Sequence, residues 1–231
     1  MLSDLKRKIG KTKLGKKLKK VLGKGSVAND FKGSKSYWEK RYVQEGDSGS
    51  GSYGRLSLYK AKFLNQFVEE KNIDSVIEFG SGDGHQLTLA EYPNYIGFDV
   101  SQKAIDLCET LFKDDNSKTF LLVTEENLKE KEAALTMSLD VIYHLVEDEV
   151  YTAYMETLFN TSSTYVIIYA SNYDKRIAPH VLSRKFTTWV EENKTQWEMI
   201  THEKNPYPYD PSNPDHTSIA DFYIYKKTES K

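Results

Sequence analysis

The stretch Ser75-Val76-Ile77-Glu78-Phe79-Gly80-Ser81-Gly82-Asp83-Gly84 decides the fold of this chain. Its apolar run, Val76 to Phe79, predicts a buried strand, and the turn that follows has glycine at every second position. A helical pattern then begins at Gln86. Strand, glycine-rich turn and helix in this order form the nucleotide-approach unit of a doubly wound α/β sheet. Glycines in such a turn let a ligand lie against the backbone at the carboxyl end of the strand.

The spacing of the glycines limits which class of ligand the turn can bind. A dinucleotide fingerprint G-x-G-x-x-G starting at Gly80 needs glycine at position 85, where the chain has His85, so a nicotinamide oxidoreductase fits poorly. A second predicted strand ends at Asp99, whose carboxylate can accept hydrogen bonds from both hydroxyls of a ribose. The alternative is that Glu78 and Asp99 only cap the helices that follow them.

The remaining chain alternates between strand and helix patterns. Strands joined by helices indicate a parallel sheet with right-handed crossovers, whereas the last two strands are joined only by the loop 204–217 and should be antiparallel. The predicted fold class is α/β, a doubly wound seven-stranded sheet that is mostly parallel with one antiparallel C-terminal strand. The predicted strands are 76–79, 95–98, 119–123, 133–138, 164–170, 196–202 and 219–226, and the predicted helices are 36–42, 56–71, 85–91, 101–113, 125–132, 146–159 and 179–192.

The pattern E-x-G-x-G-x-G from Glu78 to Gly84, followed by Asp99, resembles motif I and its neighbouring acid in the class I S-adenosylmethionine (SAM) dependent methyltransferases. The resemblance covers about residues 36–226 and implies a Rossmann-like fold with SAM as cofactor. The residues implied as cofactor contacts are Glu78, Gly80, Ser81, Gly82, Asp83, Gly84, Gln86, Asp99, Val100, Ser138 and Leu139, and the closer resemblance described next adds Tyr53 and Arg55.

Four segments look more specifically like methyltransferases found with bacterial capsule and surface-polysaccharide biosynthesis enzymes. This resemblance implies O-methylation of a sugar or a small phosphorylated precursor, a carbohydrate or sugar-phosphate acceptor. The proline-rich loop 205–216 and the segment 170–174 are expected to form the acceptor rim, and Arg176, Arg184 and Lys185 are either phosphate contacts or solvated charges. The four segments are 37–42, 49–56, 138–147 and 220–225.

Methyl transfer to a hydroxyl requires alignment of the reacting groups and a base that takes the proton. The candidate catalytic residues are Asp140, His144 and His180, with Tyr173, His216 and Asp221 as further candidates on loop or strand ends. Histidine has the better matched pKa, but a histidine at position 144 can also be purely structural. The five histidines show no metal-ligand spacing, so no metal site is predicted.

The charge of the chain is divided unevenly. Residues 1–24 hold ten Lys or Arg and one acidic residue, Asp4, while the other 207 residues carry 22 basic and 33 acidic side chains. Apolar residues of this arm fall roughly on one helical stripe, which is typical of a peripheral anchor on an anionic membrane surface. A mobile tail or a partner-docking segment is the alternative. Nucleic acid is disfavoured, since the arm has no aromatic residue to stack on bases.

The predicted organisation is a basic amphipathic arm at 1–24, a linker at 25–35 and a methyltransferase domain at 36–231. The glycine- and serine-rich run 46–54 is either a spacer or a lid over the cofactor. The single cysteine, Cys108, permits no disulfide within the chain, and no apolar run is long enough to span a membrane. We therefore expect a cytoplasmic protein, with the inner membrane face as its place of peripheral contact.

Two other functions stay open. One is N-methylation of a small amine, a protein or RNA, although the N-P-P-Y or D-P-P-Y signature of amino-group methyltransferases is missing where Ser138-Leu139-Asp140-Val141 stands. The other is a SAM-fold scaffold that docks an assembly through its basic arm. Methyl transfer to an acceptor would distinguish both enzymes from the scaffold.

Overall fold

A seven-stranded sheet brings the loops after β1, β2 and β4 to the same edge. The computed structural model describes residues 31–228. The strand order is β3-β2-β1-β4-β5-β9-β8, and β9 runs antiparallel to both β5 and β8 while β1 to β5 pair in parallel. The predicted fold class is confirmed. The strands of the sheet are β1 (Val76–Phe79), β2 (Tyr95–Asp99), β3 (Lys118–Leu122), β4 (Ala133–Leu139), β5 (Ser162–Ala170), β8 (Trp197–Glu203) and β9 (Asp221–Lys227).

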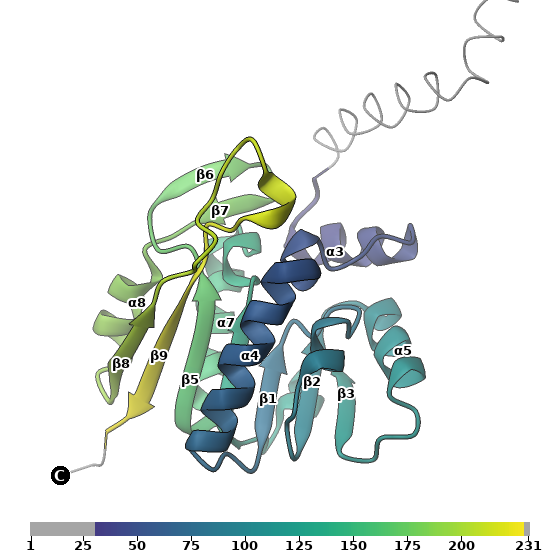
Figure 1. The fold of residues 1–231 in the computed structure, drawn as a ribbon, viewed down its shortest axis with the longest axis vertical. Coiled ribbons are helices and arrows are strands. Elements are labelled where there is room, and N and C mark those ends of the chain that lie inside the picture. Colours follow the sequence, from purple (N-terminus) through teal and green to yellow (C-terminus); the bar gives the residue numbers. More distant parts are fainter. Residues whose placement is uncertain (1–30, 229–231) are drawn as a thin grey trace, which may run out of the picture. The chain divides into compact units, whose positions relative to one another are not determined.

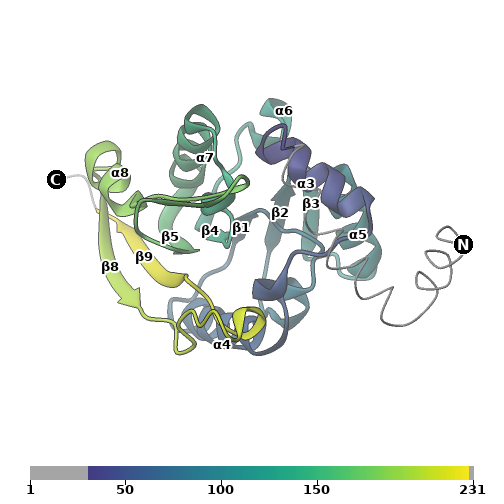
Figure 2. The same ribbon diagram turned by 90° about the horizontal axis from the view of Figure 1, so that it is seen from above.

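Helices cover both faces of this sheet (Figures 1 and 2). Buried side chains of α4, the 3-10 helix η3 and α5 pack on one face, and those of α7 and α8 pack on the other. Helix α3 lies beyond the carboxyl ends of β1, β2 and β3, at the top of the sheet in Figure 1. The helices are α3 (Ser34–Val43), α4 (Gly54–Glu70), η3 (Gln86–Leu89), α5 (Gln102–Leu111), α6 (Glu125–Leu128), α7 (Asp148–Asn160) and α8 (Phe186–Asn193).

Helix α4 illustrates how the local sequence forms these elements. Its residues Leu56, Leu64 and Phe67 recur at helical spacing and are buried. The helix ends where Asn72 adopts a left-handed backbone, with φ of 51°, which turns the chain into β1. All four residues of β1 are buried, as expected of a central parallel strand.

The predicted helix 179–192 is wrong in its first half. A β-hairpin of β6 (Lys175–Ala178) and β7 (Val181–Ser183) occupies this region, with Pro179 and His180 in its turn, and α8 begins only at Phe186. Local periodicity failed here because a hairpin depends on pairing between its strands, such as Arg176 with Leu182. Proline also removes a backbone donor that a continuing helix would use.

Other boundaries differ less. The predicted helix 85–91 is the short 3-10 helix η3, and the predicted helix 125–132 ends at Leu128. The predicted linker reaches too far, since Ser34 and Lys35 already belong to α3. The predicted arm 1–24 and linker residues 25–30 lie outside the described residues. Within residues 31–228, no helix is both long enough and apolar enough to cross a membrane.

Candidate functional site

A cavity of about 400 Å³ lies at the carboxyl ends of β1, β2 and β4. Helix α3 contributes Ser34, Lys35, Trp38 and Tyr42 to its wall. The wall thus combines the edge of the sheet, where α/β folds bind ligands, with an N-terminal helix. The predicted site residues that line it are Glu78, Gly80, Ser81, Gly82, Asp83, Gln86, Asp99, Val100, Leu139, Asp140 and His144.

The glycine turn is shaped by the protein's own packing as well as by its conformation. Gly80 and Gly82 have positive φ angles of 90° and 61°, which favour glycine. A Cβ atom at Gly80 would overlap the side chain of Val141, and one at Gly82 would overlap Ser48. Close approach of a ligand is therefore not the only reason for glycine at these two positions.

Two buried carboxyl groups lie at the ends of neighbouring strands. Asp99 accepts hydrogen bonds from the backbone N–H groups of Gly82 (3.0 Å) and Ser101 (2.9 Å), and Glu78 accepts one from the Tyr95 hydroxyl (2.7 Å). Burial raises the pKa of Asp99 to about 6 and that of Glu78 to about 7. Each carboxylate oxygen has more than one lone pair, so Asp99 can still accept hydrogen bonds from a ligand.

The segment 46–54 is folded over the glycine turn. The Asp83 carboxylate accepts hydrogen bonds from Ser48 N (2.9 Å), the Tyr53 hydroxyl (2.7 Å) and His85 N (3.0 Å). Although burial opposes its ionisation, these bonds hold the pKa of Asp83 below its ordinary value. The Tyr53 ring also stacks on His85, with centroids 4.2 Å apart. Tyr53 therefore contacts the turn, and it lies outside the lining of the cavity.

Two buried polar atoms of the lining have no hydrogen-bond partner among residues 31–228: Ser81 Oγ and Gln86 Oε1. Gln86 is held in place by its amide nitrogen, which donates to the Ser57 carbonyl at 3.1 Å. Buried polar atoms without a partner are uncommon in folded proteins and mark places where a ligand or water supplies the missing bond.

Asp140 is engaged by a lysine that the sequence analysis did not identify. The Asp140 Oδ2 atom lies 2.8 Å from Lys60 Nζ, and its Oδ1 atom accepts a hydrogen bond from the Tyr143 hydroxyl at 2.8 Å. Lys60 lies four residues after Leu56 and four before Leu64, within the buried stripe of α4. A lysine inside an apolar helical stripe was the available sequence signal.

His144 is held by a backbone carbonyl. Its Nδ1 atom lies 3.1 Å from the His180 carbonyl oxygen, so Nδ1 carries the proton in the neutral ring. Burial lowers the pKa of His144 to about 4. The ring of Trp38 packs edge-on against it at 4.9 Å. His144 is therefore a neutral imidazole in the wall of the cavity.

The structure places several predicted residues away from the lining. The His180 ring stacks on Tyr37 at 4.4 Å and lies parallel to the His144 ring, with centroids 6.0 Å apart, and burial lowers the pKa of His180. Arg55 donates from Nε to the His216 carbonyl and lies over the Tyr207 ring at 4.3 Å. Gly84 faces Cys108, and Ser138 bonds to the Tyr154 hydroxyl at 2.8 Å.

Of the further catalytic candidates, Asp221 is bonded to neighbouring residues and Tyr173 is exposed to solvent. The Asp221 Oδ2 atom lies 2.9 Å from His202 Nε2, and its Oδ1 atom accepts from Asn205 N at 2.8 Å. Tyr173 is exposed. No group of three or more His, Cys, Asp or Glu side chains in the described part of the chain is arranged to hold a metal ion.

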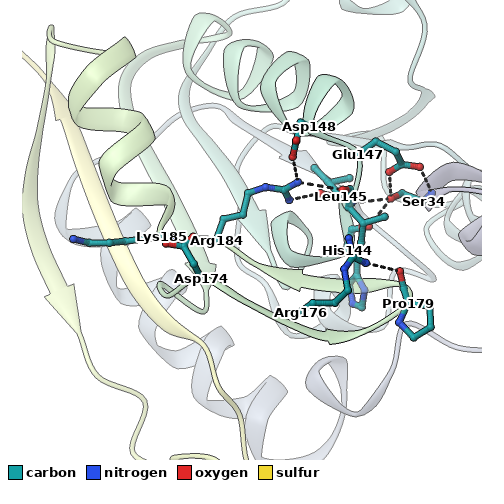
Figure 3. A network of polar contacts seen from close by, with 11 residues as sticks. Ser34, His144, Leu145, Glu147, Asp148, Asp174, Arg176, Pro179, Arg184 and Lys185 are labelled. Carbon is teal, nitrogen blue, oxygen red and sulfur yellow. Dashed lines mark hydrogen bonds and ion pairs between the residues drawn. The ribbon is translucent and has the colours of Figure 1, made fainter.

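The loop that carries His144 is tied to two other elements (Figure 3). Ser34, at the start of α3, donates from Oγ to the His144 carbonyl (2.6 Å) and from N to Glu147 Oε1 (2.8 Å). From the other side, Arg184 donates to the Leu145 carbonyl (2.5 Å) and to Asp148 (2.6 Å). Arg184 is therefore a structural clamp and not a solvated charge.

No protein-family model and no curated protein sequence matches the chain. Several solved structures do match it. The N-methyltransferase NodS from Bradyrhizobium japonicum WM9, in complex with S-adenosylhomocysteine (SAH), is 12% identical with a TM-score of 0.66, covering 85% of this chain and all of that one (100%).

Two further structures match over similar lengths. Magnesium protoporphyrin IX methyltransferase from Synechocystis PCC 6803 with bound SAH is 13% identical, with a TM-score of 0.59 and coverage of 89% of this chain and 100% of that one. An O-methyltransferase family protein from Burkholderia thailandensis is 11% identical, with a TM-score of 0.57 and coverage of 77% and 57%. The chain therefore has the fold of class I methyltransferases.

Proposed function

We propose that this chain is a SAM-dependent methyltransferase. The observation that carries the proposal is the cavity beside the glycine turn, where the buried Asp99 carboxylate stands with the unpartnered atoms Ser81 Oγ and Gln86 Oε1. A nucleoside with an amino-acid tail supplies hydroxyl and amino donors for such acceptors. Solved methyltransferases of the same fold, two of them with SAH, support it.

The residues of the cavity fit this cofactor. Asp99 would accept from ribose hydroxyls, and the glycine turn from Gly80 to Gly82 would lie against the ligand backbone. Ser81 Oγ and Gln86 Oε1 would gain partners. The apolar side chains Val100 and Leu139 of the same wall would cover the flat face of a base. Tyr53 and Asp83 would act by holding the segment 46–54 over the turn.

When bound, SAM supplies a methyl group on a sulfonium: the acceptor atom bonds to the methyl carbon, and the sulfur keeps the electron pair of the broken carbon–sulfur bond. The chain must align the acceptor and remove its proton. We propose that His144 removes this proton. The His180 carbonyl fixes its Nδ1–H, so Nε2 carries the lone pair. Asp140, paired with Lys60, would orient the acceptor.

The proposed acceptor is a hydroxyl of a sugar or of a small phosphorylated precursor used in surface glycan biosynthesis. The resemblance of four segments to capsule-associated methyltransferases supports this acceptor, and the aromatic side chain of Trp38 in the cavity wall suits the face of a sugar ring. N-methylation is the second candidate, because a matching structure is an N-methyltransferase.

We further propose that residues 1–24 hold the protein at the cytoplasmic face of an anionic membrane. Each Lys or Arg near such a surface contributes about 1 kcal/mol, and the arm has ten. A membrane-proximal position would bring the enzyme close to glycan precursors assembled there.

Calorimetric titration with SAH tests the proposal, with NAD as the control ligand. We expect micromolar binding of SAH alone, and loss of about two orders of magnitude in affinity for Asp99→Ala because a charge-assisted contact is removed. The exposed Asp114→Ala is the matched control and should bind like the wild type. Binding of NAD instead of SAH would overturn the proposal. Binding of SAH without transfer to any acceptor would favour the scaffold.

A further inference from the structure

Lys60 is a lysine in the wall of the cavity whose side chain is only 1% exposed. Burying an ammonium group is costly unless it is paired, and here its partners are the Asp140 carboxylate and the face of the Tyr169 ring, 5.4 Å from Nζ. Other buried positions of the α4 stripe, such as Leu56 and Leu64, are apolar. Helix packing alone does not call for a charge at this position.

The pair is held in one arrangement. Asp140 has a left-handed backbone with φ of 61°, and its N–H donates to the Tyr169 carbonyl at 2.9 Å. Its carboxylate is shared between Lys60 and Tyr143. A Cβ atom at Gly51 would lie 2.8 Å from Asp140 Oδ2, so the segment 46–54 closes over the same carboxylate. A strained non-glycine residue fixed this firmly is typical of functional sites.

The carboxyl groups of the cavity differ in the groups that bond to them directly. Neutral donors hold the carboxyl groups of Glu78, Asp83 and Asp99, whereas a cation holds that of Asp140. The acidic part beside the glycine turn suits a cationic ligand. At Asp140 the charges of Lys60 and Asp140 nearly cancel. An ammonium group would therefore find no unpaired carboxylate in this part of the wall.

We propose that Lys60 is a specificity-determining residue, which neutralises Asp140 and so makes the acceptor side of the cavity select a neutral or anionic oxygen nucleophile over an amine. This inference rests on the proposed methyltransferase function and names the class of its acceptor. An ammonium group placed here meets the Lys60 charge, whereas an oxygen nucleophile that gives its proton to His144 gains negative charge, which Lys60 stabilises.

Binding of two cofactor analogues tests the charge at this wall without an acceptor. SAH has an uncharged sulfur, whereas sinefungin carries an ammonium-bearing carbon in its place. The measurement is the ratio of sinefungin affinity to SAH affinity, by calorimetry. We expect Lys60→Met to raise this ratio about tenfold, because Asp140 loses its counter-ion. Asp140→Asn should lower the ratio about tenfold, because Lys60 then has no counter-ion.

The double variant Lys60→Met/Asp140→Asn removes both charges and should return the ratio to that of the wild type. Neutral replacement of a buried ion pair is often tolerated, so the double variant shows whether the pair can be removed without unfolding. If Lys60→Met does not fold, Asp140→Asn carries the test, because its ratio should fall below that of the double variant. The exposed Lys62→Met and Asp114→Asn are matched controls and should leave the ratio unchanged. If the single variants fold and keep the wild-type ratio, the proposed role of Lys60 is overturned, but the methyltransferase function is not. Failure of the wild type to bind SAH would overturn the methyltransferase function as well.

Discussion

Glu78 is the third residue of strand β1 and is only 5% exposed. Burial raises its pKa to about 7, from an ordinary value of 4.5, although the Tyr95 hydroxyl and the Lys60 charge oppose this. The folded chain therefore binds this proton more tightly than the unfolded chain. The stabilising contribution of the bound proton is complete below about pH 4.5 and is lost as the pH rises through about 7.

This sign gives a prediction for Glu78→Gln, which keeps an acceptor for Tyr95 and cannot ionise. Between pH 5 and pH 8 we expect the free energy of unfolding of the wild type to fall by about 2 kcal/mol relative to that of the variant. Urea unfolding at both pH values measures the difference. The exposed Glu69→Gln should follow the wild type. Parallel pH dependences for Glu78→Gln and the wild type would contradict the burial argument.

His144 gives a second prediction at the residue scale. Because burial lowers its pKa to about 4 and Nδ1 faces a carbonyl, the ring should stay neutral, protonated at Nδ1, throughout the range above about pH 5. Long-range proton–nitrogen NMR spectra report both tautomer and titration, with His144→Gln for assignment. His180→Ala should leave this tautomer unchanged, since the contact uses the backbone. Titration near pH 6.5 would refute it.

At the scale of elements, the β6–β7 hairpin is connected to the cavity through the loop after β4 (Figure 3). Arg184 donates to the Leu145 and Val146 carbonyls and lies over the Tyr151 ring at 4.5 Å. Arg176 only closes its own hairpin, by a bond to the Pro179 carbonyl. The sequence does not distinguish the two arginines, but in the structure only Arg184 bonds to a different element.

We therefore expect Arg184→Met to lower the free energy of unfolding by about 2 kcal/mol, because two loop carbonyls lose their donor. Little of this loss should come from Asp148, whose side chain is 91% exposed. Arg176→Met is the matched variant and should change stability by less than about 0.5 kcal/mol. Denaturant unfolding of both proteins decides it, and equal effects would show that Arg184 is no clamp.

At the scale of the whole molecule, the charge of the chain is separated between the arm and the remainder. Residues 1–24 carry ten of the 32 basic side chains and one of the 34 acidic ones. Deletion of residues 1–24 should abolish sedimentation with vesicles that contain anionic lipid, and should leave SAH affinity and the melting temperature unchanged. High salt should weaken vesicle binding of the full chain, since charge attraction is screened. Equal vesicle binding by both proteins would refute the membrane role.

The sequence by itself determined the sheet and the place of the cavity. The apolar run before Gly80, the alternate glycines and the carboxylate Asp99 all follow from short-range patterns, because a buried parallel strand and its turn are specified by neighbouring residues. The alternation of strands and helices, with an antiparallel final strand, was likewise sufficient for the fold class. Local consistency of this kind makes a fold readable from a single sequence.

The tertiary structure decided which side chains act together. Lys60 and Asp140 are 80 residues apart, and Ser34 and Glu147 are 113 apart, so no local pattern reports either contact. The same reason explains why the His180 carbonyl bonds to His144 Nδ1, and why a hairpin stands where a helix was predicted. Pairing across strands and burial of a charge depend on what packs opposite, and that is known only once the chain is folded.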